Sequence, residues 1–169
     1  MHNTLETFKL SGKVCLITGG AGFLGKKHAE AILDAGGIPV LLDIDVVRID
    51  HVVNELKNAY QKEIDGFQVD ITDKNTLMKV KKKVLEKYQR IDILINNAAN
   101  NPKVEDGGVD NWTRFENFSE KNWNQDFAVG VTGAFLCAQI FGSYMAKQKF
   151  GVILNISSDL GIIAPDQRI

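Results

Sequence analysis

The sequence predicts an α/β fold, a doubly wound parallel sheet with helices on both faces, because two patterns alternate along it. Short apolar runs typical of buried strands are followed by longer segments with the spacing of amphipathic helices. No linker, repeat or low-complexity tract interrupts this alternation, so residues 1–169 are expected to form a single domain. Strands are expected at 14–18, 38–42, 66–69, 91–95 and 152–156, and helices at 24–35, 46–60, 73–88 and 120–148. Asp73 is expected to cap the third helix, and a loop is expected at 100–118 before the fourth.

The first expected strand ends at a burst of glycine, the most informative stretch of the chain. Residues 18–25 read Thr-Gly-Gly-Ala-Gly-Phe-Leu-Gly, and an amphipathic helix follows. Glycines let the backbone turn tightly and approach a ligand closely, while a helix N-terminus offers unpaired N–H groups to an anion. Strand, glycine turn and helix therefore predict a site for a dinucleotide pyrophosphate. The simpler alternative is a tight turn that binds nothing.

An acidic residue, Asp43, ends the second expected strand. A carboxylate about 20 positions beyond the glycine turn is placed to accept hydrogen bonds from the adenosine ribose. Its charge would repel a 2′-phosphate, so the sequence favours NAD over NADP as the cofactor. The alternative is a solvated carboxylate at a strand end, and Asp45 is a weaker candidate for the ribose contact.

Composition narrows the class of protein. The chain has 44% apolar residues and a formal net charge of −1, which supports neither nucleic-acid binding nor a membrane-surface role. No uninterrupted apolar run approaches the roughly 18 residues that span a bilayer, and residues 1–6 lack a signal-peptide pattern. Cys15 and Cys137 are expected as buried thiols, and the histidines lack metal-ligand spacing. We expect a cytoplasmic protein without a metal site.

The lysine-rich segment at 73–88 is the one feature that favours nucleic acid. Its lysines alternate with apolar side chains at helical spacing, which is typical of a helix that packs on a sheet and keeps its charges in water. Nucleic-acid binding is the minor alternative. The lysines are Lys79, Lys81, Lys82, Lys83 and Lys87.

From about residue 10 to 169 the chain resembles the short-chain dehydrogenase/reductase family. The matching motifs are Thr18-Gly19…Gly22…Gly25, Asp70-Ile71, Asn96-Asn97-Ala98-Ala99 and Asn155-Ile156-Ser157-Ser158. The glycine spacing is nearer the extended, epimerase-like branch, whereas Asn-Asn-Ala-Ala belongs to the shorter reductase branch. We follow the latter motif because it is the more distinctive.

The resemblance implies an NAD(P)-binding Rossmann-type domain that transfers a hydride between nicotinamide and a carbonyl or hydroxyl substrate. It assigns Ser158, which lies three residues before a glycine, to orient the substrate oxygen. Ser157 is the runner-up, and the alternative is that both serines only cap a strand end. The residues expected to bind the cofactor are Gly19, Gly22, Phe23, Leu24, Gly25, Asp43, Asp70, Ile71, Asn97, Ala98 and Ala99.

Two departures from the family pattern concern catalysis. The Tyr-x-x-x-Lys pair does not occur up to Ile169, since no tyrosine has a lysine four residues on. We therefore expect a domain that is incomplete at its C-terminus, resembling the N-terminal two-thirds of an enzyme and lacking turnover by itself. Gly130 stands where the family has the asparagine of its proton relay. A non-catalytic dinucleotide-binding or assembly protein is the alternative function.

The resemblance also carries two finer expectations. Residues 157–168 are similar to a stretch of bacterial oxidoreductases linked to flagellin glycosylation and nonulosonic-acid sugars, which implies a sugar-derived substrate. In the family the helix at 120–148 helps to build a homodimer or homotetramer. Its apolar surface here is larger than one sheet face needs, through Phe127, Val131, Ala134, Phe135, Ala138, Phe141 and Met145.

Overall fold

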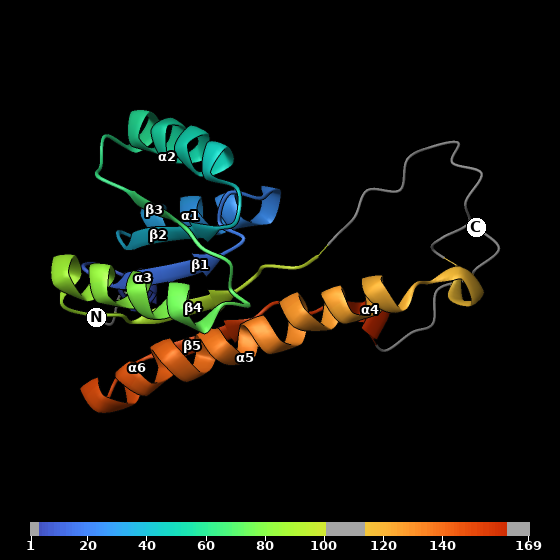
Figure 1. The fold of residues 1–169 in the computed structure, drawn as a ribbon. Coiled ribbons are helices and arrows are strands. Elements are labelled where there is room, and N and C mark those ends of the chain that lie inside the picture. Colours follow the sequence, from blue (N-terminus) through green and yellow to red (C-terminus); the bar gives the residue numbers. More distant parts are fainter. Residues whose placement is uncertain (1–3, 101–113, 162–169) are drawn as a thin grey trace.

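The computed structural model describes residues 4–100 and 114–161 (Figure 1). Five parallel strands form one sheet in the order β3-β2-β1-β4-β5. This is the doubly wound α/β fold that the sequence predicts, and each strand lies within two residues of its expected position. The strands are β1 (Val14–Thr18), β2 (Ile38–Asp43), β3 (Asp65–Gln68), β4 (Ile93–Asn96) and β5 (Val152–Asn155).

The helices also follow the predicted pattern. The segment from Glu120 to Gln148 is a single helix of 29 residues, called here the long helix, and two π-helical stretches interrupt its α-helical hydrogen bonding. Short 3₁₀ turns occur at Thr4–Phe8, Phe115–Asn117 and Asp159–Gly161. The helical elements are α1 (Phe23–Asp34), α2 (Val46–Tyr60), α3 (Lys74–Tyr88), and, within the long helix, α4 (Glu120–Phe127), α5 (Ala134–Cys137) and α6 (Ser143–Gln148).

Helices cover both faces of the sheet, as expected (Figure 1). Alternate residues of β1 point into two separate cores: Cys15 and Ile17 pack under α1 and α2, whereas Leu16 packs under α3 and the long helix. Cys15 and Cys137 are buried free thiols, as predicted. Burial raises the pKa of both to about 12, so neither is a reactive thiolate at neutral pH.

The lysine-rich helix α3 is amphipathic, as its spacing predicts. Leu77, Val80 and Val84 are buried against the sheet. Asp73 caps the helix by accepting a hydrogen bond from the Asn75 N–H, as predicted for its N-terminus. Four of the five lysines are exposed and Lys81 is half-buried.

The long helix is a candidate membrane span that the search for uninterrupted apolar runs did not identify. Within the described ranges it alone is long and apolar enough to cross a membrane by length and composition, because an 18-residue window within it has a mean hydropathy of 1.4. Uninterrupted runs miss it because small and polar residues punctuate its apolar positions. Cys137, Phe141 and Met145 on this helix belong to the hydrophobic core, but only 22% of the apolar window is buried.

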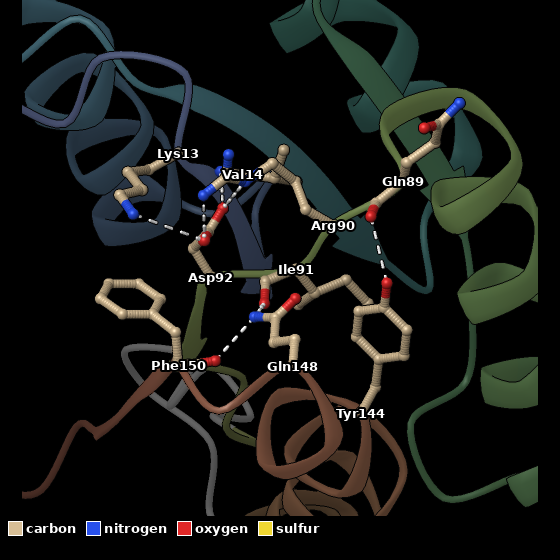
Figure 2. A network of polar contacts seen from close by, with 9 residues as sticks. All are labelled: Lys13, Val14, Gln89, Arg90, Ile91, Asp92, Tyr144, Gln148 and Phe150. Atoms are coloured by element: carbon tan, nitrogen blue, oxygen red, sulfur yellow. Dashed lines mark hydrogen bonds and ion pairs between the residues drawn. The ribbon is translucent and has the colours of Figure 1, made fainter.

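A buried carboxylate holds the edge of the sheet at which β1 and β4 begin (Figure 2). Asp92, 1% exposed, accepts hydrogen bonds from the Val14 N–H at 2.9 Å and from two nitrogens of Arg90 at 2.7 Å. Lys13 lies 3.8 Å from the same carboxylate and 3.8 Å from the centre of the Phe150 ring. Asp92 thereby joins the starts of both strands.

The long helix is attached to the same edge by side chains that donate to backbone carbonyls (Figure 2). Gln148 donates to the carbonyls of Ile91 and Phe150, and the Tyr144 hydroxyl donates to the carbonyl of Gln89 at 3.1 Å. These contacts tie α6 to the turn between α3 and β4. These polar contacts hold together the edge at which β1 and β4 begin. The pocket described below lies at the opposite edge, where the strands end.

We predict that Asp92→Asn lowers the free energy of unfolding by about 2 kcal/mol at pH 7, because a charged, buried hydrogen-bond acceptor is lost. Burial opposes ionisation of Asp92, but Arg90, the Val14 N–H and Lys13 outweigh it and hold its pKa below the ordinary value. This stabilisation is therefore complete above about pH 4 and is lost as the pH falls through the lowered pKa. Urea unfolding at pH 7 and pH 3 measures it.

The exposed Asp50 on α2 offers the control, since Asp50→Asn should leave the unfolding free energy unchanged at both pH values. The difference between Asp92→Asn and the unsubstituted protein should shrink at pH 3. An equal difference at both pH values would contradict the assigned role of the carboxylate.

Candidate functional site

A pocket of about 420 Å³ lies at the carboxyl ends of β1, β2 and β4. It adjoins the point between β1 and β4 where the strand order reverses, which is where ligands bind in open α/β sheets. Ten of the eleven residues predicted to bind a cofactor line this pocket. They are Gly19, Gly22, Phe23, Leu24, Asp43, Asp70, Ile71, Asn97, Ala98 and Ala99.

The glycine turn brings the start of α1 against the end of β1. Gly19 has a positive φ of 61°, which favours glycine, and the Gly22 N–H donates to its carbonyl at 3.0 Å. Gly25, the eleventh residue, packs behind the pocket: a Cβ there would lie 2.1 Å from the Gly19 carbonyl oxygen. Only glycine permits this close approach of helix to turn.

The N-terminus of α1 is suited to an anion. Its N-cap is Gly22, which has no side chain to accept hydrogen bonds from the N–H groups of the first turn. Those groups are therefore not capped by this residue and can face a ligand. Gly22, Phe23 and Leu24 all line the pocket. Together with the glycine cradle, this geometry fits a dinucleotide pyrophosphate.

Asp43 lies at the end of β2, on the pocket wall. One carboxylate oxygen accepts from the Ala21 N–H at 3.1 Å, and the other accepts from the Asp45 N–H at 3.2 Å. These two bonds fix the orientation of the carboxylate and leave each oxygen able to accept a further hydrogen bond. Asp43 is thus placed to receive the hydroxyls of a ribose. Asp45 does not line the pocket and instead caps α2.

The hydroxyl of Thr18 connects the glycine turn to the segment after β4. It donates to the Ile95 carbonyl at 3.3 Å and accepts from the N–H groups of Asn97 and Ala98, each at 3.0 Å. The side chain of Asn97 returns hydrogen bonds to the carbonyls of Thr18 and Gly19. Two motifs about 80 residues apart in the chain therefore form one rigid wall.

Asp70 and Ile71, the pair expected to contact the adenine, line the pocket beyond the end of β3. The Asp70 carboxylate accepts from the N–H and the hydroxyl of Thr72, at 2.8 and 2.7 Å, which fixes the turn after β3. Ile71 is 7% exposed, and its side chain would be 2.6 Å from a Cβ at Gly133. The long helix therefore needs glycine at 133 to pack against this wall.

The candidate catalytic serines lie beyond β5 at the same carboxyl edge. Ser157 and Ser158 are both exposed, and neither lines the pocket. Ser158 Oγ is 3.3 Å from the Asp159 carboxylate. Asn155, which precedes the serines, accepts from the Asn96 side chain at 2.8 Å, so the ends of β4 and β5 are joined. Most of the stretch 157–168, expected to resemble sugar-linked oxidoreductases, lies outside the described residues, as does most of the loop expected at 100–118.

Gly130 lies in the π-helical stretch Ala128–Gly133 of the long helix. A Cβ at this position would have no atom within 4 Å, so packing does not require glycine there. The neighbouring Val129 and, one turn earlier, Gln125 line the pocket. A larger side chain would therefore fit at position 130.

The sequence interpretation missed seven of the described residues that line this pocket, and it also missed the role of the Thr18 hydroxyl. The seven are Leu42, Ile44, Arg48, Val69, Asn100, Gln125 and Val129. The role of the Thr18 hydroxyl depends on the register of β1 beside β4, which no local pattern reveals. Arg48 lines the pocket from the first turn of α2, beside Asp43. Its position in the first helical turn after the acidic strand end is the feature that could have identified it.

The fold and the pocket together define a Rossmann-type α/β domain. The family model for short chain dehydrogenases matches residues 13–168, and the chain belongs to this short-chain dehydrogenase/reductase family.

Individual relatives agree with this assignment. The chain is 34% identical to a 3-oxoacyl-[acyl-carrier-protein] reductase of Thermotoga maritima over 91% of this chain and 58% of the relative. It is 30% identical to the post-translational flagellin modification protein A of Campylobacter coli over 92% and 59%.

A solved structure supports the same fold. A 7α-hydroxysteroid dehydrogenase complexed with NADH and 7-oxo glycochenodeoxycholic acid is 27% identical, with a TM-score of 0.80, and the match covers 98% of this chain and 60% of that one. The chain thus spans less than two thirds of the length of each of these three relatives.

Proposed function

We propose that this chain is the cofactor-binding part of an NAD-dependent oxidoreductase that interconverts a hydroxyl and a carbonyl group. The observation that carries the proposal is the pocket at the β1–β4 reversal, where the glycine cradle, Asp43 and the Thr18–Asn97 wall converge. A nicotinamide bound there would donate or accept the hydride. Family membership, and NADH in the solved 7α-hydroxysteroid dehydrogenase, support a nicotinamide cofactor.

Each part of the pocket has a role in this proposal. The glycine turn and the start of α1 hold the pyrophosphate, Asp43 binds the ribose hydroxyls, and Asp70 with Ile71 contacts the adenine. Asn97, Ala98 and Ala99 form the pocket wall after β4 and support the nicotinamide. Ser158 orients the substrate oxygen, which must gain or lose a proton as the hydride moves. Gly130 offers no side chain to that proton path, so the path is either altered in this protein or completed by another group.

The substrate we propose is a small molecule, and a sugar derivative fits best. Residues 157–168 resemble oxidoreductases of flagellin glycosylation, and a flagellin modification protein is among the relatives. Asn100 and Gln125 add uncharged polar groups to the pocket wall, which suits a substrate rich in hydroxyls. We propose a cytoplasmic location and no nucleic-acid or membrane partner.

A second candidate function is dinucleotide binding without catalysis, as a cofactor sensor or an assembly subunit. The observation that favours it is Gly130, where a side chain would fit and none is present. The two functions differ in one measurable property, because only the oxidoreductase turns over a carbonyl or hydroxyl substrate. Reading the coding sequence beyond Ile169 for a Tyr-x-x-x-Lys pair separates them directly.

Cofactor choice tests the role of Asp43. We predict at least tenfold tighter binding of NADH than of NADPH, a difference of about 1.4 kcal/mol. Asp43→Asn should narrow this preference, because it removes the charge that repels a 2′-phosphate while an oxygen acceptor remains. Fluorescence titration with both dinucleotides measures the ratio, and Asp50→Asn is the matched control. Equal affinities for the two cofactors in the unsubstituted protein would remove Asp43 from this role.

Ser158 tests the catalytic part of the proposal. In the complete protein, Ser158→Ala should lower kcat/KM by about 10²-fold, or about 2.7 kcal/mol, because the lost hydrogen bond matters mainly in the transition state. Affinity for NAD should stay within about twofold. Ser157→Ala is the control and should change kcat/KM far less. The reverse order of the two serines would leave the family role intact and transfer it to Ser157.

We propose that the complete protein forms a homodimer or homotetramer through the exposed face of the long helix. Trp123, Phe127, Val131 and Phe135 recur every fourth residue and are 47–59% exposed, so they form one apolar stripe. The Trp123 and Phe127 rings lie 4.6 Å apart. A stripe of this size on a monomer would be unusual.

We predict that the complete protein self-associates and that Val131→Glu/Phe135→Glu weakens the association at least tenfold, about 1.4 kcal/mol. Both side chains are exposed, so the substitutions should leave the fold intact. Lys82→Glu on α3 is the control. Sedimentation equilibrium measures the association, and a monomer at all concentrations would refute this interface.

A further inference from the structure

The mouth of the pocket beside Asp43 contains an arginine as well as carboxylates. Arg48 is the one cationic residue among the described residues that line the pocket. It lies in the first turn of α2, where the positive end of the helix dipole disfavours a cation. An arginine in this place offers a fork of N–H donors that matches a phosphate group. A pocket selective for NAD has no evident use for it.

Asp45 pairs with this arginine in two ways. One oxygen of Asp45 accepts from the Arg48 N–H at 3.1 Å, and the other lies 3.3 Å from Arg48 Nε. The backbone N–H of Asp45 in turn donates to Asp43 at 3.2 Å. One residue therefore caps α2, orients the ribose-binding carboxylate and competes for the guanidinium.

We propose that Asp45 is a specificity-determining residue, which excludes NADPH by holding Arg48 away from a 2′-phosphate. Asp43, Asp45 and Arg48 together carry a net charge of −1. A 2′-phosphate that bound beside them would therefore be repelled, because Arg48 is already paired with Asp45. The inference rests on the proposed dinucleotide function and assigns part of its selectivity to a residue outside the pocket wall. Asp43 alone does not decide the cofactor.

The ion pair between Arg48 and Asp45 is exposed enough to be broken when the Asp45 charge is removed. The side chains of Arg48 and Asp45 are 66% and 41% exposed, and exposed ion pairs are weak. The guanidinium can therefore leave Asp45 for a stronger anion once the carboxylate charge is gone. Since the interaction is electrostatic and exposed, it should weaken as the ionic strength rises.

Asp45→Asn isolates the charge from the capping role, because asparagine caps a helix as well as aspartate does. The fold and the start of α2 should remain unchanged. We expect NADPH affinity to rise at least about fivefold and NADH affinity to stay within about twofold. A purely structural role for Asp45 would change both affinities together. Titration calorimetry of the complete protein with each dinucleotide gives the ratio without any need for turnover.

The double variant Asp45→Asn/Arg48→Gln separates recruitment of Arg48 from simple loss of repulsion. If Arg48 binds the phosphate, the gain in NADPH affinity disappears in the double variant and declines with salt in the single one. Arg48→Gln alone should change NADPH affinity by less than about twofold, since Asp45 already holds the guanidinium. A gain that persists without Arg48, or no gain in Asp45→Asn, would overturn the inference.

These outcomes are distinct from failure of the proposed function. If the unsubstituted protein binds NADH tightly and Asp45→Asn changes nothing, only the inference about Asp45 fails. If neither dinucleotide binds the unsubstituted protein or its variants, the dinucleotide function fails and the inference fails with it.

Discussion

The candidate site depends on the contact between the carboxyl ends of β1 and β4. These two strands are neighbours in the sheet although almost 80 residues separate them in the chain. The Thr18 hydroxyl bonds to both sides of this junction, and the Asn97 amide bonds back across it. Because the strands leave this point for helices on opposite faces, the junction opens into a pocket. At the other edge, Asp92 joins the starts of the same two strands, so the pair is fixed at both ends.

Most of the fold could be predicted from the sequence because each strand and helix is determined by a pattern of residues close together in the chain. Apolar runs gave the strands, helical spacing gave the helices, and Asp73 marked the start of α3. The glycine turn was equally readable, since the positive φ of Gly19 and the contact at Gly25 both require glycine. Ten residues chosen for their motifs line one pocket because parallel strands bring their carboxyl ends to one edge. Their roles toward a cofactor stay predictions.

The rest of the site could not be predicted because it depends on side chains that meet across the sheet or across a turn. The hydrogen bonds of Thr18 follow from the register of two distant strands. The pairing of Asp45 with Arg48 follows from the geometry of a helix start, in which one carboxylate serves as both cap and ion-pair partner. The π-helical turns of the long helix are likewise absent from its apolar spacing, which is that of an uninterrupted helix.

The long helix shows how one element serves two opposed surfaces. Its buried face contributes Cys137, Phe141 and Met145 to the core, while Trp123, Val131 and Phe135 lie exposed. A helix that is apolar on both sides has no stable place at the surface of a monomer in water, because its outer face stays hydrated at a cost. The same apolar character gives it the composition of a membrane span. Burial against a second copy of the chain, as proposed above, would remove this cost. Glycine at 133 lets the inner face approach Ile71 at the pocket, while the outer face stays exposed for that contact.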